Sequence, residues 1–248
     1  MTGYLAVYRR ELLSLWVTPL AWVLLTVFLL LQGMSFYFIV RHLSALADLS
    51  VDSGPVQSYF GQSIFLLVSL LILCPTLTMR VFAEERRSGT IEALLTAPVT
   101  PMAVVLGKYS AVLTTYAAMW APTILYVLIL RNTGEVDWGV VGSCYLGVFG
   151  IGAGYLAIGT LMSAMTRSQL VAAILTTVVL FGLFIFGIGE YILDTGWVRE
   201  LCTHVSVFSH MDEFSKGIVD VRRLVFYASL TGLPLFMCVR VVDSWRCG

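Results

Sequence analysis

The sequence predicts an all-α membrane protein with six transmembrane helices, and its composition and hydropathy are the reasons. Hydrophobic residues make up 58% of the 248 residues and charged residues only 12%, and the mean hydropathy is +0.89. A soluble domain of this length carries a larger charged surface. A helix needs ~20 apolar residues to cross the hydrocarbon core. Six runs reach or approach that length, at about 21–40, 62–79, 103–130, 139–165, 170–189 and 224–242.

Residues 1–18 precede the first span and are expected to form an amphipathic helix at the membrane interface. Aromatic and leucine side chains recur there at helical spacing: Tyr4, Tyr8, Leu12, Leu15 and Trp16. Arg9, Arg10 and Glu11 are expected to face away from this apolar stripe. The alternative is a flank that only helps to orient the first span. Together with the six spans, this segment makes residues 1–248 a single transmembrane domain.

The third and fourth spans carry local signals of their own. Thr100 followed by Pro101 is typical of a helix N-cap and first turn. Pro122 lies inside the third span, where a kink is tolerated because neighbouring helices satisfy the freed backbone groups. Gly150 and Gly154 form a GxxxG pair, which predicts close packing of the fourth span against another helix.

The connection after the second span, residues 82–98, is unusually polar. It holds three acids, two arginines and a glycine between two long apolar runs. Gly89 is expected to break the helix that runs out of the second span. Residues 91–96 can then form a short helix along the membrane surface. We interpret this segment as a docking element for a soluble partner, and the alternative is a solvated loop that only sets the topology.

The connection from residue 190 to residue 223 is too long for a plain turn. It is predicted to contain two short helices at the outer interface. The first is indicated by helical spacing of apolar residues, namely Trp197, Val198, Leu201 and Val205. Ser209 with Asp212 predicts the cap of the second, which would end near Gly217. No metal site is predicted, because the spacing of the His, Cys and Asp residues here is not diagnostic of one.

The basic residues predict the orientation of the chain. With six spans both termini lie on one side, and nine of the 15 Lys and Arg residues would share that side. Arg9 and Arg10, directly before the first span, weigh most in this comparison. Basic residues accumulate on the cytoplasmic side, so both termini are expected to be cytoplasmic. The formal net charge is zero, and no nucleic-acid partner is indicated.

The spans are predicted to be free of interior charge. Lys108 comes nearest to the interior, and we expect it to reach the interface by snorkelling. A charge at the bilayer centre costs at least ~2.5 kcal/mol and is retained for work such as proton relay. The absence of such a charge argues against a transporter that is driven by an ion gradient. The chain also lacks the G-x-x-x-x-G-K-[ST] loop that cradles nucleotide phosphates. Energy for transport would therefore come from another protein, and no cofactor is expected on this chain.

Three segments resemble type-2 ABC transporter permeases, especially the gliding-motility-type branch. They are Ala-Glu-Glu-Arg-Arg-Ser-Gly-Thr-Ile-Glu at 83–92, continued by Leu-Leu-Thr-Ala-Pro-Val at 94–99, Tyr-Arg-Arg-Glu-Leu at 8–12 and Phe-Ser-Lys-Gly-Ile-Val-Asp at 214–220. The resemblance implies a six-span permease subunit of an ATP-driven exporter, without catalytic activity of its own. The sequence departs from the branch at 207–212, where Val-Phe-Ser-His-Met-Asp replaces a segment that usually contains Ser-Pro.

The resemblance also implies partners. Two copies of an ABC ATP-binding subunit would bind ATP and Mg²⁺. A second permease chain, identical or paralogous, would complete the translocation path in the lipid bilayer of the bacterial inner membrane. The residues implied to couple to the ATPase are Glu84, Glu85, Arg86, Arg87, Gly89, Thr90 and Glu92.

Two alternatives remain at this point: a non-transporting membrane scaffold and, less favoured, an ion-coupled carrier. A conduit would need hydroxyl-bearing residues on a shared cavity, and the candidates are Thr114, Thr115, Ser163, Thr176 and Thr177.

Overall fold

The computed structural model describes residues 2–45, 54–61, 63–91, 99–131, 136–192 and 196–245, and this part of the chain contains helices and no strands. The helices are α1 (Thr2–Val17), α2 (Pro19–Ala45), α3 (Pro55–Phe60), α4 (Ile64–Thr78), α5 (Ala83–Ser88), α7 (Pro101–Trp120), η1 (Ala121–Thr123), α8 (Ile124–Arg131), α9 (Trp138–Met165), α10 (Gln169–Ile192), α11 (Trp197–Val205), α12 (Val207–Ser215) and α13 (Val221–Ser244). Six of the helical segments described are long and apolar enough to cross a membrane. The predicted fold class is confirmed.

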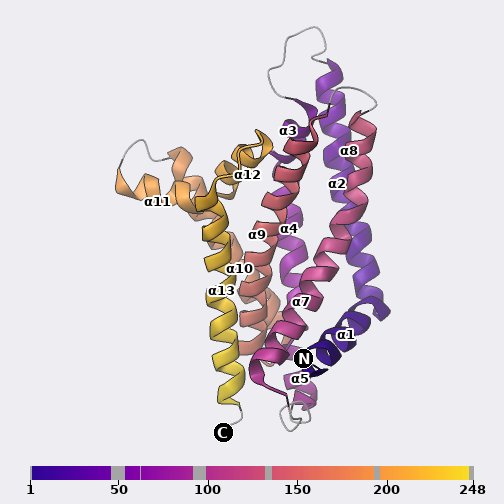
Figure 1. The fold of residues 1–248 in the computed structure, drawn as a ribbon, viewed down its shortest axis with the longest axis vertical. Helices are drawn as coiled ribbons and strands as arrows, with labels where there is room; N and C mark the ends of the chain where they lie inside the picture. Colours follow the sequence, from indigo (N-terminus) through magenta and orange to yellow (C-terminus); the bar gives the residue numbers. More distant parts are fainter. Residues whose placement is uncertain are drawn as a thin grey trace.

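The long helices form one bundle around α9 (Figure 1). In the most apolar stretch of α9, 67% of residues are buried, against 22% in α2, α10 and α13. Both ends of the chain and α5 lie at one end of the bundle, which we call the termini end. The short helices α3, α11 and α12 lie toward the opposite end, the far end.

The third predicted span is a helix with a tight turn in it. Thr100 caps α7, accepting a hydrogen bond from the Ala103 amide at 3.3 Å, and Pro101 occupies the first turn. This prediction is confirmed. Pro122 lies in the short 3₁₀ turn η1 between α7 and α8. The Thr123 hydroxyl donates to the Trp120 carbonyl at 2.6 Å, so this carbonyl has a partner within the turn.

Gly150 and Gly154 lie on the face of α9 that meets α13. A Cβ atom at Gly154 would lie 2.7 Å from Leu230 Cδ2, and one at Gly150 would lie 3.2 Å from the ring of Tyr227. A side chain at Gly154 would therefore force Leu230, or the two helices, to shift. The pair lets α13 lie close along the central helix, where it forms one wall of the site described below.

The two short helices of the fifth connection are present, but the predicted cap of the second was wrong. α11 covers the residues whose spacing predicted it. Ser206, and not Ser209, caps α12, because its hydroxyl accepts from the Ser209 amide at 3.3 Å. The Ser209 hydroxyl donates to Glu190 at the end of α10, at 3.3 Å. Gly217, at φ +77°, follows the end of α12.

α12 is fixed to α13 by polar contacts at the far end. Arg223 forms a two-pronged ion pair with Glu213, with N–O distances of 2.9 and 3.0 Å. The hydrogen bond from Arg223 holds the pKa of the Glu213 carboxyl below its ordinary value. His210 is fully buried and its Nδ1 lies 2.6 Å from the Tyr227 hydroxyl. Burial lowers the pKa of His210 to about 4, so this imidazole is neutral at pH 7.

Candidate functional site

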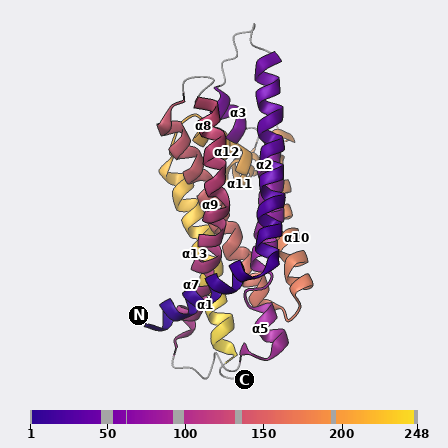
Figure 2. The same ribbon diagram turned by 90° about the vertical axis from the view of Figure 1, so that its right-hand side faces the viewer.

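The site begins with α1, which runs across the termini end of the bundle (Figure 2). The chain turns into α2 at Thr18, whose hydroxyl donates to the Leu15 carbonyl at 2.8 Å. Tyr4 donates to Ser110 at 2.9 Å and Tyr8 donates to Thr114 at 3.3 Å, both on α7. The aromatic stripe of α1 therefore packs on α7.

Glu11 does not share the outward face predicted for it with Arg9 and Arg10, so that prediction was wrong. The two arginines are exposed, while Glu11 is half-buried against the bundle. Positions 4, 8, 11 and 15 share one face of a helix because they are spaced by three or four residues. Glu11 thus belongs to the face of the two tyrosines.

Lys108 is the centre of a charged junction at the termini end. Its ammonium lies 3.0 Å from Glu11 of α1 and 3.1 Å from Glu85 of α5, and it donates to the Val81 carbonyl at 2.8 Å. Arg10 adds a contact to Glu85 at 3.3 Å. The Lys108 side chain is only 2% exposed, so the snorkelling prediction was wrong. The lysine instead joins three separate elements, α1, α5 and α7.

The first turn of α5 is fixed to its own surroundings. Glu84 pairs with Arg80 at 2.8 Å. Arg86 donates to the carbonyl of Ala164, at the end of α9, at 2.7 Å, and its guanidinium lies over the ring of Trp245, 4.6 Å from the centroid. These contacts connect α5 to both α9 and the end of α13. Three members of the predicted coupling set, Glu84, Glu85 and Arg86, are therefore engaged within this chain.

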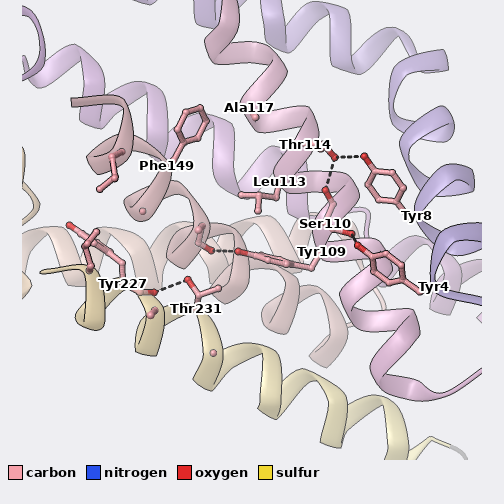
Figure 3. A pocket seen from close by; sticks show the side chains of 16 residues that line it. Tyr4, Tyr8, Tyr109, Ser110, Leu113, Thr114, Ala117, Phe149, Tyr227 and Thr231 are labelled. Carbon is pink, nitrogen blue, oxygen red and sulfur yellow. Dashed lines mark hydrogen bonds between the residues drawn. The ribbon is translucent and has the colours of Figure 1, made fainter. Parts of the chain in front are cut away.

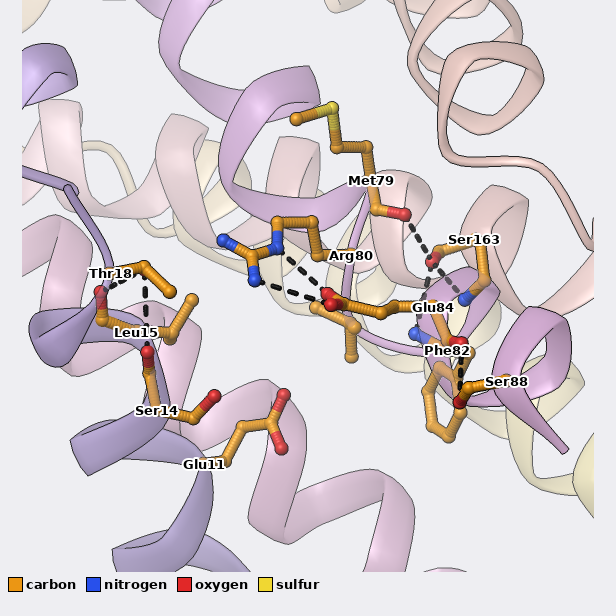
Figure 4. Close-up of polar contacts among 12 residues, drawn as sticks. Glu11, Ser14, Leu15, Thr18, Met79, Arg80, Phe82, Glu84, Ser88 and Ser163 are labelled. Carbon is orange, nitrogen blue, oxygen red and sulfur yellow. Dashed lines mark hydrogen bonds and ion pairs between the residues drawn. The ribbon is translucent and has the colours of Figure 1, made fainter. Parts of the chain in front are cut away.

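Ser163 of α9 holds the turn between α4 and α5 (Figure 4). Its hydroxyl accepts from the amides of Phe82 and Ala83, at 3.1 and 3.2 Å, and donates to the Met79 carbonyl at 3.1 Å. The helix of the second span ends here, at Thr78. The prediction that Gly89 breaks that helix was wrong, because the break occurs at the turn and Gly89 ends α5 instead, with φ +73°.

The outward part of the predicted set follows the first turn of α5. Arg87, Gly89 and Thr90 are exposed, and the Thr90 hydroxyl lies 2.9 Å from that of Ser88. A Cβ atom at Gly89 would meet no other atom within 4 Å. Glu92 and most of the predicted helix at 91–96 lie outside the described residues. The described members of the set thus form two groups. The inward group, Glu84, Glu85 and Arg86, holds α5 against the rest of the chain. The outward group, Arg87, Gly89 and Thr90, is exposed and accessible to another molecule.

The hydroxyl-bearing residues proposed for a conduit lie in separate environments in the described part of the chain. Thr114 borders a lateral cleft between α1, α7, α9 and α13 (Figure 3). Thr115 and Thr176 are buried and donate to carbonyls of their own helices, and Ser163 holds the α4–α5 turn. Thr177 is exposed on α10. In this chain alone, these residues serve mainly to stabilise helices.

The roles of Lys108, Ser163 and Trp245 were not predicted from the sequence. One signal was available: a single lysine seven residues after Pro101, in an otherwise apolar run, requires a partner if it is buried. Ser163 and Trp245 gave no comparable signal, because a serine and a tryptophan near helix ends are ordinary in membrane proteins.

The apolar bundle with its charged junction defines a multi-pass α-helical membrane protein. A family profile described as ABC-2 family transporter protein matches residues 44–202, which is more than half of the chain and includes α5, Lys108 and Ser163. The chain belongs to this family, and it is a transporter permease subunit. Chains of the family are in general non-catalytic and partner with an ATP-binding subunit. A comparison with curated proteins finds no match.

Proposed function

We infer that this chain is the membrane-spanning subunit of an ATP-driven exporter of the gliding-motility-type branch, coupled through α5 and the turn after it to a separate ATP-binding subunit. Two such subunits would bind ATP and Mg²⁺, and a second permease chain would complete the translocation path. This chain would perform no covalent chemistry. Its part would be to convert movement at the membrane surface into movement of the spans.

The observation that carries this proposal is the Lys108 junction. A soluble subunit that presses on the exposed residues after α5 acts on an element already joined to α1, α7, α9 and α13. Because Lys108 contacts Glu11 and Glu85 together, α1 and α5 are held to the same point of the third span. A displacement of α5 is therefore expected to reach both the surface helix and the bundle.

The proposal includes an orientation. The ATP-binding subunits of such an exporter are cytoplasmic, so the termini end with α5 would face the cytoplasm and the far end would face outward. The excess of basic residues on the side of the termini supports the same orientation. We propose the bacterial inner membrane as the location.

The first experiment is affinity purification of the tagged chain from its native membrane in mild detergent, followed by an ATPase assay. We expect an ATP-binding subunit in near-equal amount and hydrolysis that vanadate inhibits. A chain that is recovered alone, or with a partner that hydrolyses no ATP, would contradict the coupling and favour a scaffold.

The outward group can be tested separately from the inward one. Arg87→Ala removes an exposed charge from α5 and is expected to weaken co-purification of the ATP-binding subunit without lowering thermal stability. The matched control is Arg222→Ala, an exposed arginine at the far end. Equal co-purification with both variants would count against docking at α5.

Gly89 allows a test at one position. Its positive φ is strained for most residues but tolerated by asparagine, and its Cβ direction is open. We expect Gly89→Val to reduce transport-linked ATP hydrolysis and Gly89→Asn to preserve it. Both substitutions add a side chain of similar size to the same open space, so the pair compares a residue that is strained at positive φ with one that tolerates it. Equal activity of the two variants would refute a role for this turn geometry.

A further inference from the structure

The lateral cleft has a volume of about 1000 Å³. Its walls are α7, α9 and α13, and Tyr4 and Tyr8 of α1 lie beside α7 at its border (Figure 3). Wall residues such as Thr114 and Gly232 are exposed, so the cleft is open to the surroundings of the bundle and is not an internal cavity.

The lining of the cleft is apolar in effect. No charged residue lines it. Its hydroxyl groups are used within the protein: the two tyrosines of α1 donate to Ser110 and Thr114, Tyr109 donates to the Ala153 carbonyl at 3.0 Å, and Thr231 donates to the Tyr227 carbonyl at 2.8 Å. Since these donors are already satisfied, the surface favours an occupant that needs no hydrogen bonds.

The length of the cleft indicates the kind of occupant. On α7 it extends from Tyr109 to Ala117 and on α13 from Leu224 to Gly232, which is ~12 Å in each case at 1.5 Å per residue. A transmembrane helix from another chain crosses a hydrocarbon core of ~30 Å and would need a groove of similar length. The acyl chains of one leaflet fill only about half of that thickness.

We propose that this cleft is a binding site for the acyl chains of a membrane lipid, with the lipid head group on the side of α1. Tyrosine is favoured at the level of the head groups, which agrees with the position of Tyr4 and Tyr8 beside the cleft. Small residues on its walls, among them Gly150, Ala153 and Gly232, make the hollow. The bound chains would lie between the α1–α7 pair and α13.

This site has a consequence for the charged junction. Tyr109 borders the cleft and the neighbouring Lys108 holds Glu11 and Glu85. Acyl chains packed against Tyr4 and Tyr8 would hold α1 against α7 on the side of the cleft. The ion pair between Lys108 and Glu11 holds α1 against α7 on its opposite side. The lipid would thereby stabilise the position of α1 relative to α7.

The test uses the full chain in nanodiscs that contain phosphatidylglycerol, phosphatidylcholine and a phosphatidylcholine with a photoactivatable diazirine in its acyl chain. After irradiation, labelled peptides are mapped by mass spectrometry. We expect labelling of the cleft walls to exceed labelling of the exposed face of α10 about five-fold, which corresponds to ~1 kcal/mol of preference. Equal labelling of both surfaces would overturn the proposal, because ordinary boundary lipid contacts every exposed span.

A matched pair of variants makes the test specific. Gly232 lies in the cleft and Gly182 lies on α10 outside it, both are exposed in long helices, and a Cβ atom at either meets nothing within 4 Å. Gly232→Phe should fill the cleft and abolish the excess labelling, while Gly182→Phe should leave it unchanged.

Two further results would also overturn the proposal. One is excess labelling that survives Gly232→Phe. The other is a cleft that remains unlabelled while cysteine cross-linking across it joins two copies of the chain, which would make a second copy the occupant. The labelling requires no ATP-binding subunit, so its result is independent of the proposed coupling.

Discussion

Replacing Lys108 with methionine should strongly destabilise the termini end. The substitution leaves Glu11 and Glu85 facing each other without the ammonium that lies 3.0 and 3.1 Å from them. Breaking a buried ion pair from one side costs about 3–5 kcal/mol. The two carboxylates are 15% and 12% exposed and Arg10 still contacts Glu85, so we expect the low end, ~3 kcal/mol. For a chain of this size that is about 6–12 °C in Tm.

The buried thiols of the chain provide the assay. In the described part of the chain, Cys74, Cys144, Cys202 and Cys238 are free and buried, so their reaction with a thiol-reactive dye reports the exposure of the core as the purified protein is heated in detergent. The control is Lys216→Met, which breaks an exposed pair with Asp212 at the far end and should cost less than ~1 kcal/mol. A Lys108→Met protein that melts within a degree or so of this control would refute the reasoning.

Three further perturbations have outcomes that the structure predicts. Gly154→Leu should lower stability by about 1–3 kcal/mol through a clash with Leu230, and Gly142→Leu, where a Cβ atom meets nothing within 4 Å, should be close to neutral in the same thiol melt. Ser163→Ala leaves two buried amides of the α4–α5 turn without an acceptor, at about 1–3 kcal/mol for each group, and should accelerate their hydrogen exchange. The pKa of His210 falls from 6.5 to about 4 on folding, so the folded protein resists protonation of this residue. The free energy of unfolding should therefore be highest above pH 6.5 and should fall by up to about 3 kcal/mol toward pH 4. Replacement of His210 by glutamine should remove this dependence on pH.

The six spans could be predicted because a long apolar run in a membrane commonly adopts only one structure, the α-helix. Backbone groups in hydrocarbon must be satisfied internally, so a run of ~20 apolar residues forms a helix. Local chemistry was sufficient for the cap at Thr100. It was insufficient at the start of α12, because Ser206 and Ser209 are both good capping residues and the choice depends on where α11 ends, at Val205.

The charged junction could not be predicted, because its members are far apart in the sequence. Lys108 and Glu11 are separated by 97 positions, and nothing local indicates that α1 lies along α7. The error on Glu11 came from grouping residues by polarity. The periodicity of the helix, which places position 11 with 4 and 8, was the better guide. For Gly89, the residue type predicted a helix end correctly, but Ser163 had already ended the preceding helix by tertiary contact.

A lysine at position 108 is difficult to explain by stability alone. Well-packed apolar residues in place of a buried ion pair are often as stable or more stable. The combined variant Lys108→Met, Glu11→Gln and Glu85→Gln removes every charge that Lys108→Met would strand, so it should recover most of the lost Tm. If the junction exists to hold α1 and α5 in register, this stable variant should still show reduced coupling of ATP hydrolysis to transport. Normal coupling in it would mean that the charges serve the fold alone. Reduced coupling at normal stability would show that Lys108 positions α1 and α5 for coupling, in addition to stabilising the fold.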